Sequence, residues 1–293
     1  MLPPSDILSA CLSSAAETAM VDRRRVSELF AGAVGGPLVV GVLTPQRNAM
    51  TLAAKDVRSS LSGVYRQVYA AGVLQAFRGG SRPACMAVPQ FMAVGPVYLW
   101  TEQRLHSTAG ALFASALVES LFCYGAERRN AQVQYNATQT AASNRIEFQP
   151  LHRLVGPGFV PHVGRNAVAL MGIRLWSPYS QDVVYCAPGM QDMPEEARLV
   201  ASDLLASLVS AMMSMPLAHL FSWAACTPEL TGMSYLARAE ASCRWLTGTY
   251  KKQGAQLLAR DLVIRVNYSA FLFTGYRLVE RNFVRWGTGT EST

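Results

Sequence analysis

The stretch that decides the fold runs from Phe30 to Pro45 and reads FAGAVGGPLVVGVLTP. It consists mostly of small and apolar residues, with Gly32 and Gly36 four positions apart, and it closes on a proline. Small residues at this spacing let two membrane helices approach closely, and a proline ends or kinks a helix. The stretch therefore predicts a tightly packed membrane helix that ends near Pro45.

The same order of segments recurs along the chain. Each copy has an apolar segment that closes on a helix breaker, then a polar stretch, then a second apolar segment. The expected helix-ending positions are Pro45, Gly125 and Pro216, and the matching positions in the second segments are Met86, Arg165 and Arg265. Self-similarity at a nearly fixed period indicates a repeat architecture. We therefore expect three repeats with two helices each.

The composition favours a membrane protein whose helices are not apolar on every side. Hydrophobic residues make up 51% of the 293 residues, and the mean hydropathy is +0.16. A lipid-surrounded helix normally shows about 20 consecutive apolar residues, and no such run occurs here. Each expected helix must carry a polar stripe that faces something other than lipid. The alternative is a soluble repeat protein of amphipathic helices.

Charge separates the expected loops into two groups. The stretches within the repeats, 46–82, 127–162 and 219–261, hold 15 basic and 6 acidic residues, whereas 101–108 and 180–198 hold 2 basic and 5 acidic residues. Short positive loops stay on the side from which insertion occurs. The three long loops are therefore expected to share one side of the membrane.

No motif points to an enzyme, a metal site or nucleic-acid binding. The chain shows no CxxC pair, no histidine at a metal-ligand spacing and no clustered basic surface with stacking aromatics. We interpret the scattered cysteines as small apolar packing residues; they are Cys11, Cys85, Cys123, Cys186, Cys226 and Cys243.

From about Ser27 to Phe283 the pattern resembles the mitochondrial carrier family. The resemblance is carried by Thr44-Pro45 with Phe77-Arg78-Gly79, and by Gly158 to Arg165. It implies an all-α membrane protein of six tilted transmembrane helices around a water-accessible cavity, in the mitochondrial inner membrane, with the long loops facing the matrix. The implied units are an N-terminal extension 1–26, repeats 27–104, 105–180 and 181–283, and a tail 284–293.

In that family three acids and three bases close the matrix side as a ring of salt bridges. The ring positions here are Arg47, Met50, Glu127, Asn130, Ala218 and Phe221. Only Glu127 keeps the expected type, so at most one ion pair, Arg47 with Glu127, is expected. Met50 and Phe221 are expected to form a hydrophobic plug beside the small Ala218. The second gate, on the opposite side, is degenerate as well.

The resemblance also implies ligand positions. Its substrate-contact positions fall at Met86, Arg165, Asn166 and Arg265. Two arginines facing a cavity suit an anionic metabolite; the alternative is that water or backbone carbonyls satisfy them. Bound cardiolipin is implied at Gly72, Gly79 and Gly158, where backbone N–H groups provide anion sites. No other cofactor is implied.

Two functions follow from these features. Erosion of both gates favours a carrier-type protein that has lost transport and serves as an accessory subunit of a large inner-membrane assembly, such as a respiratory-chain complex. Its partners would be other subunits and inner-membrane lipids. The alternative is a working carrier that exchanges small anionic metabolites, which the retained arginines favour.

Overall fold

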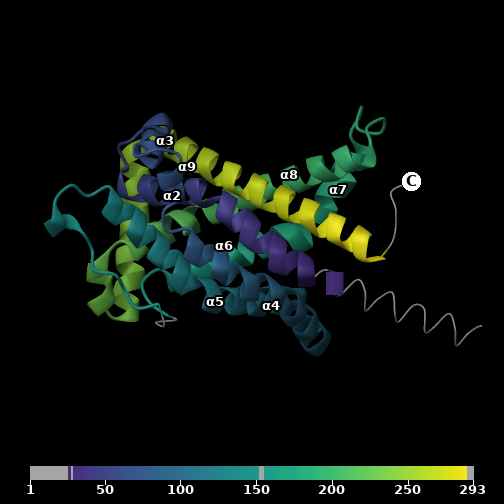
Figure 1. Cartoon of the computed structure of the whole chain (residues 1–293), viewed down its shortest axis with the longest axis horizontal. Helices are drawn as coiled ribbons and strands as arrows, with labels where there is room; N and C mark the ends of the chain where they lie inside the picture. Colours follow the sequence, from purple (N-terminus) through teal and green to yellow (C-terminus); the bar gives the residue numbers. More distant parts are fainter. Residues whose placement is uncertain (1–25, 28, 152–154, 289–293) are drawn as a thin grey trace, which may run out of the picture.

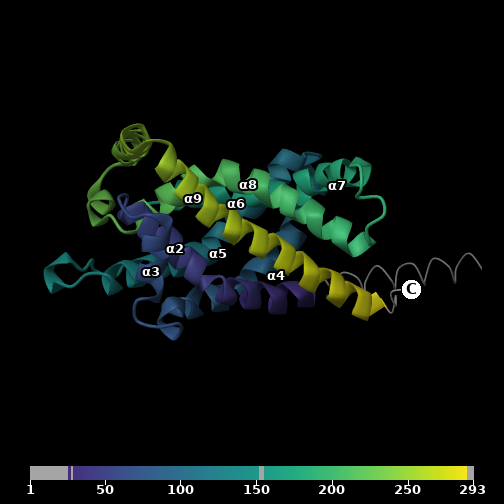
Figure 2. The ribbon, with the colours of Figure 1, turned by 90° about the horizontal axis from the view of Figure 1, so that it is seen from above.

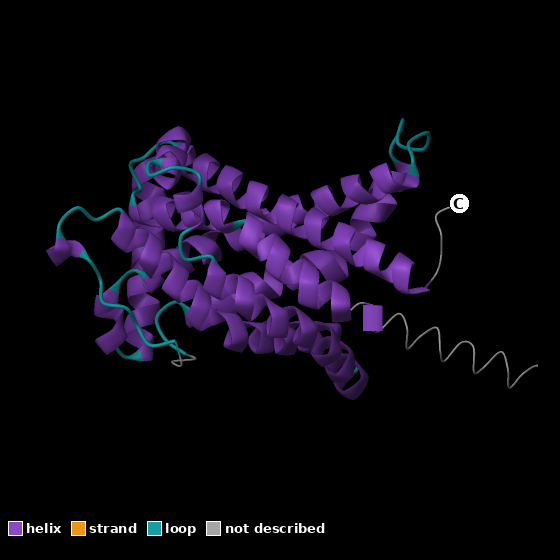
Figure 3. Ribbon diagram, in the orientation of Figure 1, coloured by secondary structure: helices purple, strands orange, loops and turns teal. Residues whose placement is uncertain are grey.

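The computed structural model describes residues 26–27, 29–151 and 155–288. The expected N-terminal extension, apart from residue 26, and the last part of the expected tail lie outside these residues. Within the described part of the chain the only regular structure is helical (Figure 3). The expected all-α class is therefore confirmed.

The first half of the chain forms a bent helix pair and two long helices. The helix Leu29–Val42 meets α2 (Thr44–Lys55) at 51°. α3 (Leu61–Tyr69) and a 3-10 turn (Leu74–Phe77) lead to α4 (Ser81–Leu105), which is followed by α5 (Thr108–Ala137).

The second half begins after a stretch that holds the 3-10 turn Ala142–Asn144. α6 (Phe159–Met171) continues through a π-helical turn (Gly172–Trp176) into α7 (Ser177–Cys186). α8 (Glu195–Ala225) and a 3-10 turn (Pro228–Gly232) precede α9 (Tyr235–Thr288). The backbone of α9 breaks at Gly254, with φ 69° and ψ −165°, so α9 consists of two helices, 235–253 and 255–288.

The long helices lie side by side in one bundle (Figures 1 and 2). α4 packs on α5, α5 on α6, α6 on α8 and α8 on α9, and α2 contacts α5, α8 and α9. α3, the chain between α5 and α6, and the first part of α9 gather at one end, which we call the α3 end; α7 lies toward the other. The three expected long loops therefore share one end of the bundle.

Two of the described helices, α5 and α8, are long and apolar enough to cross a membrane. A third candidate span is the bent pair Leu29–Val42 and α2, if the two helices count as one. The remaining described helices are too short or not apolar enough to be counted as spans by themselves, in keeping with the absence of long apolar runs in the sequence.

The expected close packing of the first helix is confirmed. A methyl group added at Gly36 would lie 2.5 Å from the Phe91 ring, and one at Gly32 would lie 3.1 Å from the Phe91 carbonyl oxygen. The helix Leu29–Val42 therefore approaches α4 at a distance that a larger side chain at Gly36 would prevent.

The expected helix end near Pro45 is confirmed, because the first helix ends at Val42 and meets α2 at 51°. A new helix begins at Thr44, and Pro45 is tolerated in its first turn, where the missing N–H is not needed. The expected ends at Gly125 and Pro216 are wrong. α5 continues past Gly125 to Ala137, and α8 continues past Pro216 to Ala225. The connecting loops are accordingly shorter than the sequence suggested.

Gly125 has a packing role rather than a terminating one. A Cβ at this position would lie 2.5 Å from the carbonyl oxygen of Leu151, so the chain after α5 crosses directly over the glycine. Only the absence of a side chain permits this approach between two backbone segments.

Gly125→Ala is therefore expected to lower the free energy of unfolding by about 1–3 kcal/mol, because the new methyl group overpacks against backbone. The melting temperature of the purified protein in mild detergent measures the effect. Gly248→Ala is the control, since Gly248 is also helical and has nothing within 4 Å of an added Cβ. That change should raise the melting temperature slightly; a similar rise for Gly125→Ala would refute the packing role.

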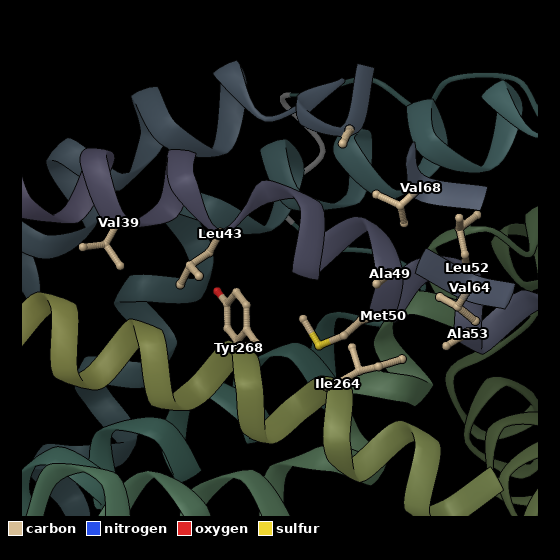
Figure 4. Packing of buried hydrophobic residues seen from close by; sticks show 12 residues of the cluster. Val39, Leu43, Ala49, Met50, Leu52, Ala53, Val64, Val68, Ile264 and Tyr268 are labelled. Atoms are coloured by element: carbon tan, nitrogen blue, oxygen red, sulfur yellow. The ribbon is translucent and has the colours of Figure 1, made fainter. Parts of the chain in front are cut away.

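Two hydrophobic clusters form the interior. The first joins α2, α3, α8 and α9 and contains Met50, Ala218 and Ile264 (Figure 4). The second joins α4, α5, α6 and α8 and contains Tyr124 and Phe221. The candidate site lies where these clusters meet.

Candidate functional site

Three arginines and one glutamate converge inside the bundle from four different helices. Arg47 comes from α2, Glu127 from α5, Arg165 from α6 and Arg265 from α9, and each is at most 7% exposed. We call these four residues the arginine centre. The fold thus brings together the three arginines that the sequence assigned to gate and ligand positions.

Glu127 is the acid of the centre. Its carboxylate accepts a hydrogen bond from Arg165, and Arg47 Nη2 lies 3.7 Å from its other oxygen. His162 Nδ1 lies 4.0 Å away. The expected pair of Arg47 with Glu127 is confirmed as the one ion pair among the described gate positions. Arg165, an expected ligand position, binds the same carboxylate more closely, which the sequence did not predict.

Tyr268 lies between Arg47 and Arg265 and contacts both. Arg47 donates a 3.0 Å hydrogen bond to its hydroxyl oxygen, and the Arg47 and Arg265 guanidinium carbons lie 5.8 and 5.3 Å from its ring centre. Arg265 also donates to Ser214 Oγ at 2.9 Å. Cation–π contacts of this kind partly compensate a buried cation. In this structure side chains, rather than the backbone carbonyls considered from the sequence, are the partners of Arg165 and Arg265.

The centre carries more positive charge than its acid balances. Within the described residues, Arg47 Nη1 and Arg165 Nε are buried donors without a hydrogen-bond acceptor. Buried donors and unpaired charges are costly unless water or an anion satisfies them. The arrangement is chemically suited to hold a small anion or ordered water between the arginines.

The hydrophobic plug expected at the gate positions forms in a different way. Met50 and Phe221 are both buried, but Met50 packs with Ala218 in the first cluster and Phe221 belongs to the second. The Arg165 guanidinium lies 4.3 Å from the Phe221 ring centre. Ala218 and Phe221 both come from α8, yet they belong to different clusters, so α8 contributes to both. A cavity of about 10 Å³ remains beside Ala218.

Amide side chains hold the α3 end of the bundle together. Asn130, a gate position, donates to Asn48 Oδ1 at 3.0 Å, and Asn48 donates to the carbonyls of Ala76 and Arg78. Gln132 of α5 donates to the Ala225 carbonyl at the end of α8, at 3.1 Å. Neutral hydrogen bonds thus join α2, α5 and α8 near the positions where the carrier family has ion pairs.

A second polar network, the Arg260 network, joins α9 to the end of α2. Arg260 donates to the carbonyls of Ala53, Asp56 and Ser59 at 2.8 to 3.0 Å and pairs with Asp261. The carbonyls at a helix end have no partner within the helix. Arg260 therefore caps α2 from a neighbouring helix.

Asp261 extends the Arg260 network into α8 and the first part of α9. Asp261 Oδ2 lies 3.0 Å from His219 Nδ1, and the Tyr250 hydroxyl lies 2.8 Å from the same nitrogen. Burial and the Asp261 carboxylate raise the pKa of Tyr250 above its ordinary value of 10.0, so this hydroxyl stays protonated. Four helical segments thus meet in one hydrogen-bonded group.

The opposite end of the bundle also carries ion pairs. Asp203 of α8 lies 3.0 Å from Arg281 and 3.8 Å from Arg277, and Arg277 pairs with Glu280 at 3.0 Å. These charges join α8 to α9 only. They differ from the second gate of the carrier family, which would connect the even-numbered helices.

The remaining expected ligand positions divide into two groups. Asn166 is buried and donates to Ser120 Oγ at 3.1 Å, close to the centre. Met86 is only half-buried, and the polar group of α4 is instead Gln90, one turn later, which donates to Glu119 at 2.7 Å. The three glycines expected to bind lipid share one geometry, a positive φ: Gly72, Gly79 and Gly158.

The expectation about the cysteines holds only in part, and one polar pair was not predicted. Cys123 and Cys226 are buried as packing residues, but Cys85, Cys186 and Cys243 are exposed because they lie on outward helix faces. Sequence reasoning also missed Gln90 with Glu119, although an acid within an apolar segment was a visible signal.

No known protein-family model matches the chain, and the curated protein sequences give no match to it either.

Proposed function

We propose that the chain is a membrane protein of the mitochondrial-carrier type that no longer transports and serves as an accessory subunit of a respiratory-chain assembly in the inner membrane. Three features of the described residues support the membrane part of this proposal. They are the candidate spans, the helix bent at Pro45, and large apolar side chains exposed on the outside of the bundle, such as Phe113, Met212 and Phe271.

The proposed fold has three repeats of two spans. The spans would be the bent pair 29–55, α4, α5, α6 with α7, α8, and α9 after Gly254. The breaks at Pro45 and Gly254 and the continuous helix from α6 to α7 are compatible with this assignment. In this proposal the α3 end faces the matrix, and the charge difference between the two groups of loops supports that orientation.

The observation that carries the loss of transport is the nature of the contacts at the α3 end. A transport cycle needs contacts that break and re-form at similar free energy in two states. Here the helices are joined by neutral hydrogen bonds from asparagine and glutamine side chains and by hydrogen bonds from Arg260 to backbone carbonyls. Opening would leave buried carbonyls and amides without partners, which costs about 1–3 kcal/mol for each group. A bundle of this kind is suited to a structural role.

A second function is favoured by the arginine centre alone. Its spare buried donors suit an anion, so a carrier for small anionic metabolites would use Arg47, Arg165 and Arg265 as substrate ligands. This function requires that the α3 end opens despite the amide and arginine contacts described above.

The accessory role predicts that the protein co-migrates with a respiratory complex on a native gel after extraction in mild detergent, because subunit interfaces survive such extraction. The purified protein should show no saturable exchange of phosphate, nucleotides or carboxylates in liposomes. A free species of carrier size, together with phosphate uptake that Arg265→Ala abolishes, would overturn the accessory role and favour the anion carrier.

A further inference from the structure

A large cavity lies between α4 and α9, on the opposite side of the arginine centre from the α3 end. We call it the α4–α9 cavity; its volume is about 670 Å³, within the range of roughly 300–1,000 Å³ that small-molecule sites occupy. Most of its wall is apolar, including Phe91, Trp100, Ile173 and Phe273. Such a wall fits the body of an organic molecule.

The cavity also has a polar floor formed by Glu119 and Gln90. Gln90 is 6% exposed and donates to Glu119 Oε1 at 2.7 Å. The other carboxylate oxygen, Oε2, is buried and has no hydrogen-bond partner in the described residues. No lysine, arginine or histidine of that part of the chain lies within 4.0 Å of the Glu119 carboxylate. An acid inside a membrane bundle normally has a partner.

The other charged groups that line the cavity already have partners. Glu280 is paired with Arg277 at 3.0 Å. Arg174 is exposed at the rim and lies over the Tyr98 ring, 5.3 Å from its centre. Among the described residues of the lining, Glu119 is therefore the acid that has no ion pair within 4.0 Å.

We propose that the α4–α9 cavity binds an amphipathic organic cation. Its ammonium or guanidinium group donates to Glu119, and its apolar body lies against Phe91, Trp100 and Phe273. The shape and the apolar area select the body, and the buried carboxylate selects the head group. This site differs from the arginine centre in residues and in the sign of its ligand, and it does not depend on the proposed accessory role.

The test uses the purified full-length protein in a mild non-ionic detergent and three probes with the same eight-carbon chain: octylamine, octanol and octanoate. Melting temperature is measured against probe concentration at neutral pH. Octylamine is expected to stabilise the protein at lower concentration than the other two. Glu119→Gln should weaken the octylamine response roughly 10- to 100-fold, the loss of a charge-assisted hydrogen bond.

Two further variants separate the site from general effects of charge or folding. Glu102→Gln removes an acid of the neighbouring helix α4 that accepts a hydrogen bond from Tyr98 and does not line the cavity, and it should keep the full octylamine response. Gly95→Leu adds bulk to the cavity wall, where an added Cβ meets nothing within 4 Å, and it should block the response without unfolding. An equal or stronger effect of octanoate, or a full octylamine response in either Glu119→Gln or Gly95→Leu, would overturn the proposal.

Discussion

Replacing Arg260 with methionine is expected to lower the free energy of unfolding by about 3–5 kcal/mol, because the change removes one partner of a buried ion pair. The Arg260 side chain is 4% exposed, and it donates to the carbonyls of Ala53, Asp56 and Ser59 as well as to Asp261. Methionine fills similar space without a donor, so the end of α2 loses its cap. The melting temperature in mild detergent should fall on the order of 10 °C.

The matched control is Arg244→Met. Arg244 also pairs with an acid, Glu240, but both side chains are at least 70% exposed, and surface pairs contribute little. The melting temperature of Arg260→Lys should lie between those of Arg260→Met and Arg244→Met, because an ammonium keeps the charge but cannot reach the same set of acceptors as a guanidinium. If Arg260→Met melts like Arg244→Met, the Arg260 network does not hold the α3 end, and the main support for a permanently closed bundle is lost.

The sequence predicted the helical class and the first helix well, because both depend on local pattern. Gly32 and Gly36 indicated a close helix contact, and Phe91 is the residue that contacts them. The break near Pro45 was predicted correctly, whereas the helix ends at Gly125 and Pro216 were not. Gly125 was interpreted as a breaker from its residue type, yet whether a glycine ends a helix or admits another segment depends on what packs against it. That information lies in the tertiary structure.

The candidate site was predicted in part for a similar reason. Matching the repeats placed Arg47 near Glu127, since equivalent positions of a symmetric bundle face its axis. The bond between Arg165 and Glu127 was not predicted, because it depends on the rotation and bend of α6 and on the direction of a long side chain. Arg260 and Asp261 lay in a stretch assigned to a loop, where adjacent opposite charges indicate a solvated surface.

Glu127→Gln is expected to destabilise the protein by about 3–5 kcal/mol, since it leaves buried arginines without their acid. Glutamine keeps the shape and still accepts a hydrogen bond from Arg165, so the loss reports the missing charge. The variant should melt on the order of 10 °C lower in mild detergent. Adding Arg165→Met to Glu127→Gln removes one unpaired cation, and it should recover part of the loss even though Arg165→Met alone is destabilising.

The same variants distinguish the two functions proposed for the chain. Without the negative charge of Glu127, the three arginines of the centre have no acid to balance them, so inorganic phosphate should raise the melting temperature of Glu127→Gln more than that of the unaltered protein. The double variant should respond less, because one of the three cations is gone. If the double variant is no more stable than Glu127→Gln, the arginines do not repel one another across the centre. If phosphate stabilises the unaltered protein as strongly as the variant, an anion site coexists with Glu127, and the anion carrier becomes the better assignment.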